Sequence, residues 1–269
     1  MKVLILGKGY ISNFLVDVFN GKGYKVDNFS RKELDYADED ELYSIISTEP
    51  YEAVINTVGF TGRPNVDECE TRRQECFDLN VKLPKTVENI CKLCDVNFVH
   101  ISSGCIYTGY DKDYNEEDEP NFGMFNDKAS FYSKTKHAGE MMLSPKNLLT
   151  KLLKYDFLID FVNSKTDVYK LSEFVFAVVE NFKAGIYNAV HSNPLSTKEV
   201  VKILKEYELV NENWNFIPYD ELDIKAHRSN CILNNDKAFD DFNFEWGDEE
   251  TYLRLNASLI SNREKWNDK

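Results

Sequence analysis

The chain has 269 residues, a length that suits one large domain or a main domain with a smaller appendage. Hydrophobic residues make up 42% of it and aromatic residues 13%, so a substantial core can form, which argues against wholesale disorder. Lys and Arg number 32 against 46 Asp and Glu, and the net charge of −14 argues against a nucleic-acid-binding protein, which needs a basic surface.

The first 140 residues alternate between short apolar runs and amphipathic stretches. The run VLIL at residues 3–6 is apolar throughout, as in a strand that is buried on both faces. Strands are predicted at residues 3–6, 24–29, 53–56 and 97–101, and helices at residues 13–20, 40–48, 78–92 and 131–143. Because strands separated by helices form parallel sheets, the pattern predicts an α/β fold with a Rossmann-type doubly wound parallel sheet.

This alternation breaks after the helix at residues 131–143. Ser144 and Pro145 follow, and residues 147–151 at once begin another helical pattern, where a doubly wound sheet would place a buried strand. Either the protein has lost a core strand or this chain omits a segment between Ser144 and Pro145. Because the loss of a central strand would expose apolar faces, we favour the omission.

The last third of the chain has the pattern of a smaller lobe. Helices are predicted at residues 172–182, 196–207 and 248–266, a strand at residues 185–190 and a polar loop at residues 219–230. Ser196 and Glu199 form a capping box at the start of one helix. A substrate-binding lobe is expected here.

Six cysteines are scattered along the chain, at positions 69, 76, 91, 94, 105 and 231. No signal peptide precedes them, since Met1 and Lys2 lead directly into an apolar strand, and we expect reduced thiols and a cytoplasmic location. Cys91 and Cys94 form a CxxC late in a predicted helix without a second ligand pair, so we interpret them as ordinary helix residues. We expect no metal site and, without a long apolar run, no contact with membranes.

A glycine-rich turn follows the first strand. Gly7 and Gly9 stand at the first two positions of a GxGxxG turn, in which Tyr10 and Ile11 open the helix and Ser12 replaces the third glycine. Such a turn lets a diphosphate approach the backbone and the N–H groups of the helix N-terminus. The alternative is a glycine turn without a ligand.

The residues at the end of the second strand indicate which cofactor is bound. An acidic residue there holds the 2′-hydroxyl of NAD, whereas Arg accommodates the 2′-phosphate of NADP. Ser30 and Arg31 stand at this corner and favour NADPH, with NADH as the weaker alternative; Asn56, at the end of the third strand, is a further expected cofactor contact. We therefore expect an NADP-binding Rossmann domain at residues 1–144. Residues 145–269 would be mainly a substrate-binding lobe, interleaved with the last strands and helices of the Rossmann domain.

Tyr132 and Lys136 form a YxxxK pair. Positions i and i+4 share one face of a helix, so the ammonium lies beside the phenol and favours its ionised form. This lowers the phenol pKa from about 10 and makes Tyr132 a plausible proton donor to a carbonyl.

With these motifs the sequence resembles the extended short-chain dehydrogenase/reductases, and among them the nucleotide-rhamnose synthases. The bacterial dTDP-4-dehydrorhamnose reductases are more distant relatives. The most specific stretches are TGRPNVD at residues 61–67, SGCIY at 103–107, EEDEPNF at 116–122, SFYSKTK at 130–136, NLLTK at 147–151 and RSN at 228–230. The resemblance covers nearly the whole chain, and members of the family carry a Leu-, Arg- and Pro-rich strand where this chain lacks one.

The resemblance implies roles for five catalytic residues. Ser103 and Tyr132 would act with Lys136 in reduction, whereas Cys105 and Lys151 would act in epimerisation. The alternatives are a buried structural thiol at Cys105 and an ordinary exposed lysine at Lys151.

Four further residues are candidate substrate contacts beside Ser103 and Cys105. Arg63 follows the third strand, at the sheet edge where ligands bind in open α/β folds. Asn121 and Phe122 precede the catalytic helix and follow an acidic loop at residues 111–119, and Arg228 lies in a late polar loop, where it could hold a diphosphate. A surface ion pair is the alternative for each arginine, and a loop tip for the Asn–Phe pair.

The resemblance implies a bifunctional enzyme that converts UDP-4-keto-6-deoxy-D-glucose to UDP-L-rhamnose with NADPH. One alternative is a 4-keto reductase that needs a separate epimerase, as in dTDP-4-dehydrorhamnose reductase. Another is a non-catalytic regulatory subunit, against which the retained Ser103, Tyr132 and Lys136 argue. The expected partner is a nucleotide-sugar substrate; UDP or dTDP, and a monomer or a homodimer, stay open.

Overall fold

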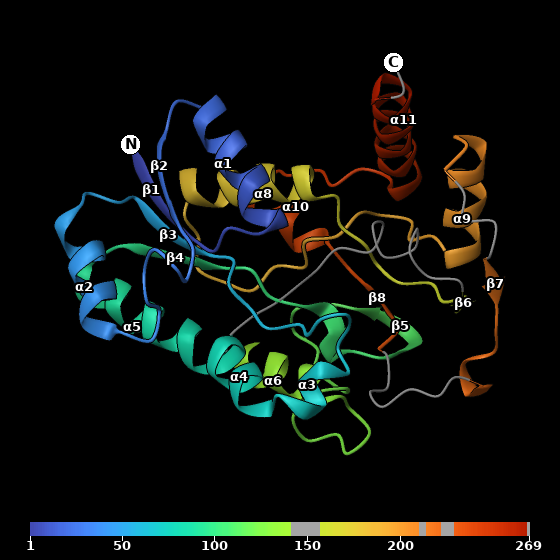
Figure 1. The fold of residues 1–269 in the computed structure, drawn as a ribbon, viewed down its shortest axis with the longest axis horizontal. Coiled ribbons are helices and arrows are strands. Elements are labelled where there is room, and N and C mark those ends of the chain that lie inside the picture. Colours follow the sequence, from blue (N-terminus) through green and yellow to red (C-terminus); the bar gives the residue numbers. More distant parts are fainter. Residues whose placement is uncertain (141–156, 210–213, 222–228, 268–269) are drawn as a thin grey trace.

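A four-stranded parallel sheet in the order β2-β1-β3-β4 forms the centre of the protein (Figure 1). The computed structural model describes residues 1–140, 157–209, 214–221 and 229–267. The strands are β1 (Lys2–Leu6), β2 (Lys25–Phe29), β3 (Ala53–Asn56) and β4 (Asn97–His100). All neighbours pair in parallel, so that Leu4 lies between Asp27 and Val54. The predicted α/β parallel sheet is confirmed.

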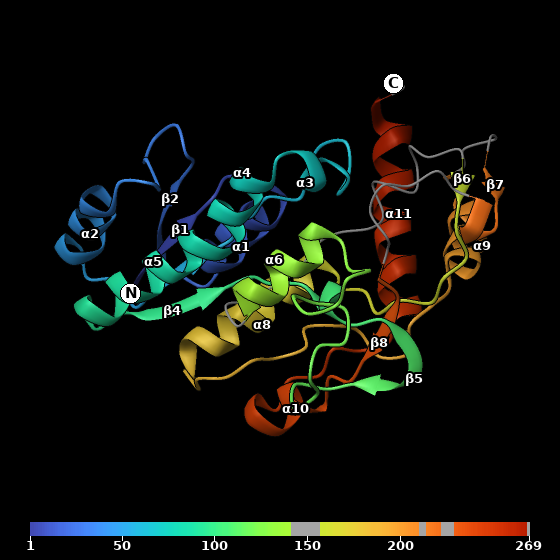
Figure 2. The ribbon, with the colours of Figure 1, turned by 90° about the horizontal axis from the view of Figure 1, so that it is seen from below.

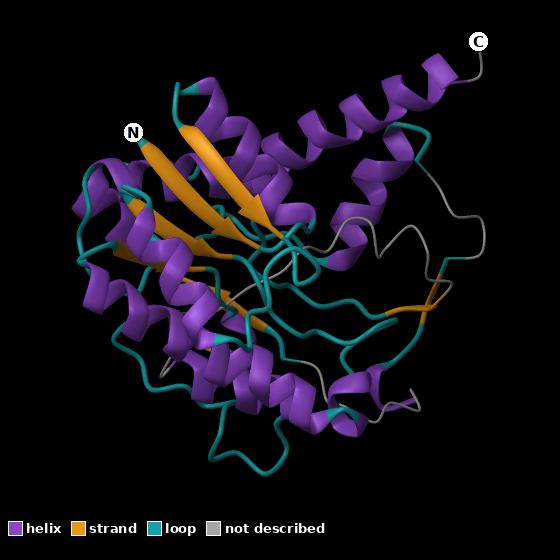
Figure 3. Ribbon diagram, turned by 60° about the vertical axis from the view of Figure 1, so that its left-hand side comes forward, coloured by secondary structure: helices purple, strands orange, loops and turns teal. Residues whose placement is uncertain are grey.

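Helices cover both faces of this sheet (Figure 3). The helices α1 (Tyr10–Gly21) and α8 (Val168–Glu180) pack on one face, and α2 (Glu39–Thr48) and α5 (Leu83–Cys94) on the other. Val3 and Ile5 belong to the first core, whereas Leu4 and Leu6 belong to the second. Because successive strand residues face opposite sides, β1 must be apolar throughout.

A nearly continuous helical segment leads from β3 to β4. It consists of α3 (Glu68–Thr71), α4 (Arg73–Phe77), a π-helical turn (Asp78–Lys82) and α5. Helix α6 (Phe131–Glu140) packs against the π-helical turn (Figure 2). The helix predicted at residues 78–92 therefore exists, but its first turn has the wider π geometry, which is frequent at functional sites.

The remaining elements gather beyond the carboxyl ends of the strands (Figure 1). They include the strands β5 (Gly109–Tyr114), β6 (Phe157–Leu158), β7 (Asn215–Phe216) and β8 (Cys231–Leu233) and the helices α9 (Thr197–Glu206) and α11 (Glu249–Asn267). The helix α10 (Asp236–Phe242) instead packs beside α8 in the first core. β5 pairs with β8 and β6 with β7. A separate apolar cluster joins α9, α11, β6 and the segment around β7.

Two predictions of secondary structure are wrong. Residues 185–190 form no strand, because no described strand lies beside them to share hydrogen bonds. Part of the acidic loop expected at residues 111–119 belongs to β5, whose partner β8 lies more than a hundred residues further along the chain. Local polarity could not reveal this pairing.

The expected break between Ser144 and Pro145, and with it the proposed domain boundary, lies outside the described residues. Both stay predictions. Within the described part of the chain, no helix is long and apolar enough to cross a membrane.

Candidate active site

The glycine turn lies where its spacing predicts, between β1 and α1. Gly7 has φ +103°, and a Cβ there would lie 2.6 Å from the Thr57 Oγ1. A Cβ at Gly9 would meet nothing within 4 Å, so the backbone of Gly9 faces open space. Ser12 is buried, and its hydroxyl donates to the Gly9 carbonyl at 2.8 Å and accepts from the Gly9 N–H at 2.7 Å. Serine therefore fills the third glycine position without opening the turn.

The corner after β2 contains a carboxylate that the motif did not reveal. Glu33 accepts hydrogen bonds from the Ser30 N–H and hydroxyl, and pairs with Lys8 at 2.5 Å. The hydrogen bonds from Lys8 and Ser30 lower the pKa of Glu33 to about 2. Arg31 is exposed and lies 3.5 Å from Glu75. Two expected cofactor contacts thus stand beside acidic groups.

Asn56 ends β3 next to the glycine turn and is fully buried. Its Oδ1 accepts from the Val58 N–H at 2.9 Å, whereas its Nδ2 has no hydrogen-bond partner in the described part of the chain. An unsatisfied buried amide donor is costly, so a ligand that supplies an acceptor here would bind favourably.

Tyr132 and Lys136 lie on one face of α6, and both are almost completely buried, at 3% and 2% exposure. The Lys136 ammonium reaches the turn after β3: a Cβ at Gly59 would lie 3.4 Å from the Lys136 Nζ. Since Thr57, two residues earlier, touches Gly7, one short segment joins the glycine turn to the Tyr–Lys helix.

The pKa of Tyr132 differs from what the YxxxK spacing predicts. Burial raises the pKa of this phenol well above its ordinary value, the nearby Cys105 adds to the rise, and a hydrogen bond with Ser103 opposes it. The YxxxK spacing predicts a lowered pKa for this phenol, and that prediction is wrong, because the shift is upward. Tyr132 is consequently held in its protonated form, which is the form that a proton donor needs.

Ser103 and Cys105 follow β4 and meet Tyr132 across the site. Ser103 is buried and caps a short 3₁₀ turn (Gly104–Ile106) by accepting the Cys105 N–H at 3.3 Å. Cys105 is half-buried and packs in one cluster with Tyr132 and Phe60. The structure therefore brings together the hydroxyl, the phenol and the thiol that the sequence singles out.

The candidate substrate contacts lie in different surroundings. Asn121 uses its side chain locally: the amide accepts from the Thr108 N–H and donates to the Thr108 carbonyl. Phe122 is buried, and Arg63 is exposed with no ion pair within the described residues. Lys151 and Arg228 lie outside the described residues. The assigned roles of all these residues stay predictions.

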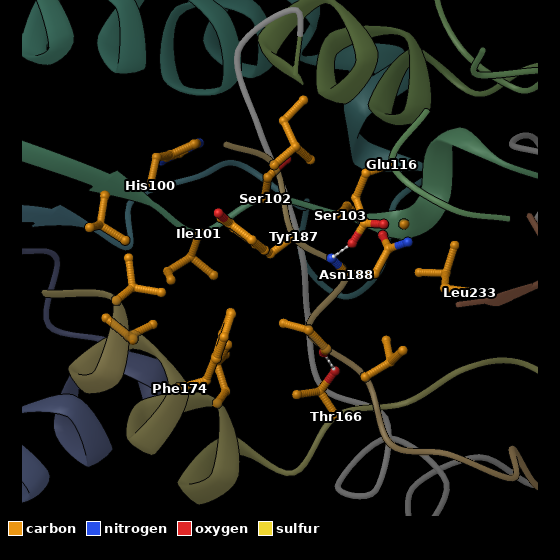
Figure 4. Close-up of a pocket in the computed structure, with 18 of the residues that line it drawn as sticks. His100, Ile101, Ser102, Ser103, Glu116, Thr166, Phe174, Tyr187, Asn188 and Leu233 are labelled. Atoms are coloured by element: carbon orange, nitrogen blue, oxygen red, sulfur yellow. Dashed lines mark hydrogen bonds between the residues drawn. The ribbon is translucent and has the colours of Figure 1, made fainter. Parts of the chain in front are cut away.

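A cavity of about 830 Å³ opens beside Ser103 and Cys105 (Figure 4). It extends from Tyr107 and Asn163, near the 3₁₀ turn, along β4 to the last turns of α5. This volume is in the range of small-molecule sites. Ser103 and Cys105 line one end of it, and residues of β4, α5 and α8 line much of the rest.

Asn80 is a central residue of the site that no motif revealed. It lies fully buried in the π-helical turn, and its amide accepts the Phe60 N–H at 2.7 Å and donates to the Phe60 carbonyl at 2.9 Å. It also lies 3.1 Å from the Thr135 hydroxyl on α6. A single side chain thus ties the turn after β3 to the Tyr–Lys helix. Only its place in a predicted helix was visible in the sequence, because the contacts come from three separate segments.

The parallel sheet, the glycine turn at its first strand and the buried Tyr–Lys helix define a Rossmann-type extended short-chain dehydrogenase/reductase. A family model described as the RmlD substrate-binding domain matches residues 1–154, more than half of the chain. The chain belongs to this family.

Two curated relatives from Arabidopsis thaliana are each 28% identical to the chain. One is the trifunctional UDP-glucose 4,6-dehydratase/UDP-4-keto-6-deoxy-D-glucose 3,5-epimerase/UDP-4-keto-L-rhamnose-reductase RHM2, with 90% of this chain and 40% of that protein covered. The other is the bifunctional dTDP-4-dehydrorhamnose 3,5-epimerase/dTDP-4-dehydrorhamnose reductase, with 89% and 87% covered. The chain thus spans less than half the length of the first of these proteins.

Two solved structures show the same fold at low sequence identity. The L780 UDP-rhamnose synthase from Acanthamoeba polyphaga mimivirus has a TM-score of 0.84 at 23% identity, with 96% of this chain and 99% of that chain covered. A dTDP-4-dehydrorhamnose reductase from Bacillus anthracis, in complex with NADP, has a TM-score of 0.79 at 19% identity, with 94% and 97% covered.

We predict that Asn80→Ala lowers the free energy of unfolding by about 1–3 kcal/mol, because it leaves both backbone groups of Phe60 unsatisfied in the interior. Urea denaturation measures the difference. Asn20→Ala, on the exposed face of α1, is the control and should change stability by less than about 0.5 kcal/mol. Equal stabilities of the two variants would contradict the role of Asn80.

Proposed function

We propose that the protein is an NADPH-dependent bifunctional enzyme that converts UDP-4-keto-6-deoxy-D-glucose to UDP-L-rhamnose by 3,5-epimerisation and 4-keto reduction. The observation that carries the proposal is the meeting of Tyr132 with Ser103 and Cys105, the last two of which line the cavity. The similarity to an epimerase/reductase along 87% of its length supports both activities. The similarity to RHM2 favours UDP as the nucleotide.

The residues present fit a dinucleotide. The open backbone at Gly9 leads into the N-terminus of α1, and the Asn56 Nδ2 offers an unused donor close by. Bound NADPH would supply the hydride for reduction at C4. The similar reductase in complex with NADP supports this choice, and Ser30 and Arg31 would hold the 2′-phosphate.

The epimerase step uses the acidity that the 4-keto group gives to C3 and C5. Removal of a proton from either carbon leaves an enolate, whose oxygen can accept hydrogen bonds from Ser103 and Tyr132. Inversion requires that one group takes the proton from one face and another group delivers a proton to the opposite face. Cys105, which packs in one cluster with Tyr132, is proposed for one of these roles, and Lys151 is proposed for the other.

The reductase step uses Tyr132 as the proton donor to the C4 oxygen. Its raised pKa keeps the proton on the phenol until negative charge develops on the substrate oxygen. The Lys136 ammonium on the same helix face then stabilises the phenolate that remains. Ser103 holds the carbonyl in line with the phenol.

A direct test is to incubate the protein with UDP-4-keto-6-deoxy-D-glucose and NADPH without any other enzyme and to identify the sugar formed. UDP-L-rhamnose supports both activities. A reduced 6-deoxy sugar with unchanged C3 and C5 would show a reductase alone. If NADPH is oxidised with neither the UDP-linked nor the dTDP-linked substrate, the protein is not the proposed enzyme.

Tyr132→Phe should lower the rate of NADPH oxidation at least about 100-fold, since it removes the proton donor and preserves the ring. The measurement is the loss of absorbance of NADPH at saturating substrate. Tyr43→Phe changes an exposed phenol on α2 and should retain the normal rate. Near-normal turnover of the Tyr132 variant would exclude the proposed acid.

Cys105→Ala should abolish deuterium uptake from D₂O at C3 and C5, because the thiol is a proposed proton carrier. Nuclear magnetic resonance of the recovered sugar measures the uptake, and retained NADPH binding shows that the fold is intact. Cys94→Ala, on α5, is the matched control. If uptake persists in the Cys105 variant, the thiol is not the epimerase group.

Two substitutions at the corner after β2 should change the preference for NADPH over NADH in opposite directions. Arg31→Asp should raise the Kd of NADPH more than that of NADH, because it replaces a cation with a second carboxylate at the expected 2′-phosphate position. Glu33→Gln should lower the Kd of NADPH relative to that of NADH, because it removes the negative charge of the carboxylate that accepts from Ser30. Fluorescence titration with both cofactors measures the ratios, and unchanged ratios in both variants would contradict the assignment of this corner.

A further inference from the structure

A loop bends between the two elements that carry the proposed catalytic residues. Ser103 and Cys105 lie at the 3₁₀ turn after β4, whereas Tyr132 and Lys136 lie on α6. The chain between β5 and α6 passes below α6 in Figure 1. Residues 121–126 of this chain are joined to both elements by hydrogen bonds, and we call them the strap.

One end of the strap is fixed to the 3₁₀ turn and to the residues that follow it. Phe122 donates its backbone N–H to the carbonyl of Ile106, the last residue of the turn, at 2.8 Å. The Asn121 side chain accepts from the Thr108 N–H and donates to the Thr108 carbonyl, both at 2.8 Å. Its second amide hydrogen goes to the Tyr114 hydroxyl at 2.9 Å. These contacts occupy both donors and the oxygen of the amide, so Asn121 anchors the strap.

A histidine of α6 holds the other end of the strap. His137 directly follows Lys136, is 7% exposed, and accepts the Met124 N–H on its Nδ1 at 2.9 Å. A Cβ at Gly123 would lie 2.1 Å from the same nitrogen, so the strap backbone lies directly against the imidazole. Because Nδ1 accepts a hydrogen bond, the ring is neutral and carries its proton on Nε2. Burial lowers the pKa of His137, which favours this neutral form.

Internal hydrogen bonds make the strap move as one body. Asn126 donates its backbone N–H to the Gly123 carbonyl at 3.1 Å and its side-chain amide to the Asn121 carbonyl at 2.8 Å. Phe122, which lies between these two residues, is 5% exposed. A displacement of the strap at α6 is therefore transmitted to the 3₁₀ turn.

The contacts of His137 favour a positioning role over a role in contact with substrate. Its side chain is not among those that line the described cavity. Within the described part of the chain, no group of three His, Cys, Asp or Glu residues could hold a metal. The contacts described for the ring are with the strap: the Met124 N–H and the edge of Phe125, whose centroid lies 6.1 Å away.

We propose that His137 is a positioning residue, which acts through the strap to hold the turn of Ser103 and Cys105 against the helix of Tyr132 and Lys136. Loss of the Nδ1 acceptor would release the strap from α6, and the hydroxyl, the thiol and the phenol would no longer converge. Small displacements of reacting groups lower rates strongly. The effect on turnover rests on the proposed function, whereas the contact itself does not.

The test compares three variants of the full chain. His137→Leu removes the acceptor at similar volume, and His137→Ala removes it without added bulk. His137→Asn is the matched control, because its amide oxygen can take the place of Nδ1. We expect the Leu and Ala variants to behave alike and the Asn variant to resemble the unchanged protein.

Alkylation of Cys105 by iodoacetamide reports on the packing of the turn against α6 without turnover. Mass spectrometry of the Cys105 peptide separates this thiol from the other five. The rate should rise about fivefold or more in the Leu and Ala variants, because a released turn exposes the thiol, and should stay within about twofold in the Asn variant.

Steady-state kinetics give the functional readout, with rates counted per NADPH-binding site so that unfolded protein does not contribute. The kcat for NADPH oxidation should fall about tenfold or more in the Leu and Ala variants and be restored by Asn. The KM of the sugar and the Kd of NADPH should stay within about threefold, because His137 acts on the catalytic groups and touches neither ligand.

Three results would overturn the inference. The first is an unchanged alkylation rate of Cys105 in the Leu and Ala variants. The second is a fall in kcat that the Asn variant does not restore, which would show that ring shape and not the acceptor matters. The third is a raised KM of the sugar at unchanged kcat, which would mean that the strap binds substrate instead. If the unchanged protein turns over no substrate, the proposed function fails, and the alkylation rates alone decide the inference.

Discussion

The hydrogen-bonding requirement of buried parallel strands is the constraint on which the rest of the structure depends. Each strand presents N–H and C=O groups on both edges, and away from water these groups need partners. β1 lies between β2 and β3 and satisfies both edges. This pairing fixes the register that brings Gly7, at the end of β1, against Thr57, just after β3. The place of the glycine turn is thus a consequence of the sheet.

The chemistry of the site follows from the removal of water around groups that this sheet positions. Tyr132 and Lys136 enter a region where almost no surface is exposed, and burial alters the phenol more than any single neighbour does. In the same region, Asn80 satisfies the backbone of Phe60 and bonds to Thr135 on α6, which holds the turn after β3 against that helix. The rigidity of this region and the protonation state of Tyr132 therefore have one physical origin.

The same requirement explains why two predictions from local sequence patterns are wrong. Residues 185–190 have the composition of a strand, yet a strand exists only where a neighbour shares its hydrogen bonds. β5 is polar and acidic, yet it is a strand because β8 lies beside it. In both cases the deciding partner is distant in the sequence or outside the described residues, so that no short window contains the information.

The sequence by itself determined the four central strands, the helices between them, the glycine turn and the pairing of Tyr132 with Lys136 on one helix face. These features depend on periodicity and on residues a few positions apart, so that they can be read from short stretches of the sequence. Only the tertiary structure decided that Glu33 stands at the corner after β2, that Asn80 joins Phe60 to Thr135, and that burial raises the pKa of the Tyr132 phenol. Desolvation and hydrogen bonding between distant segments arise only when the chain has folded.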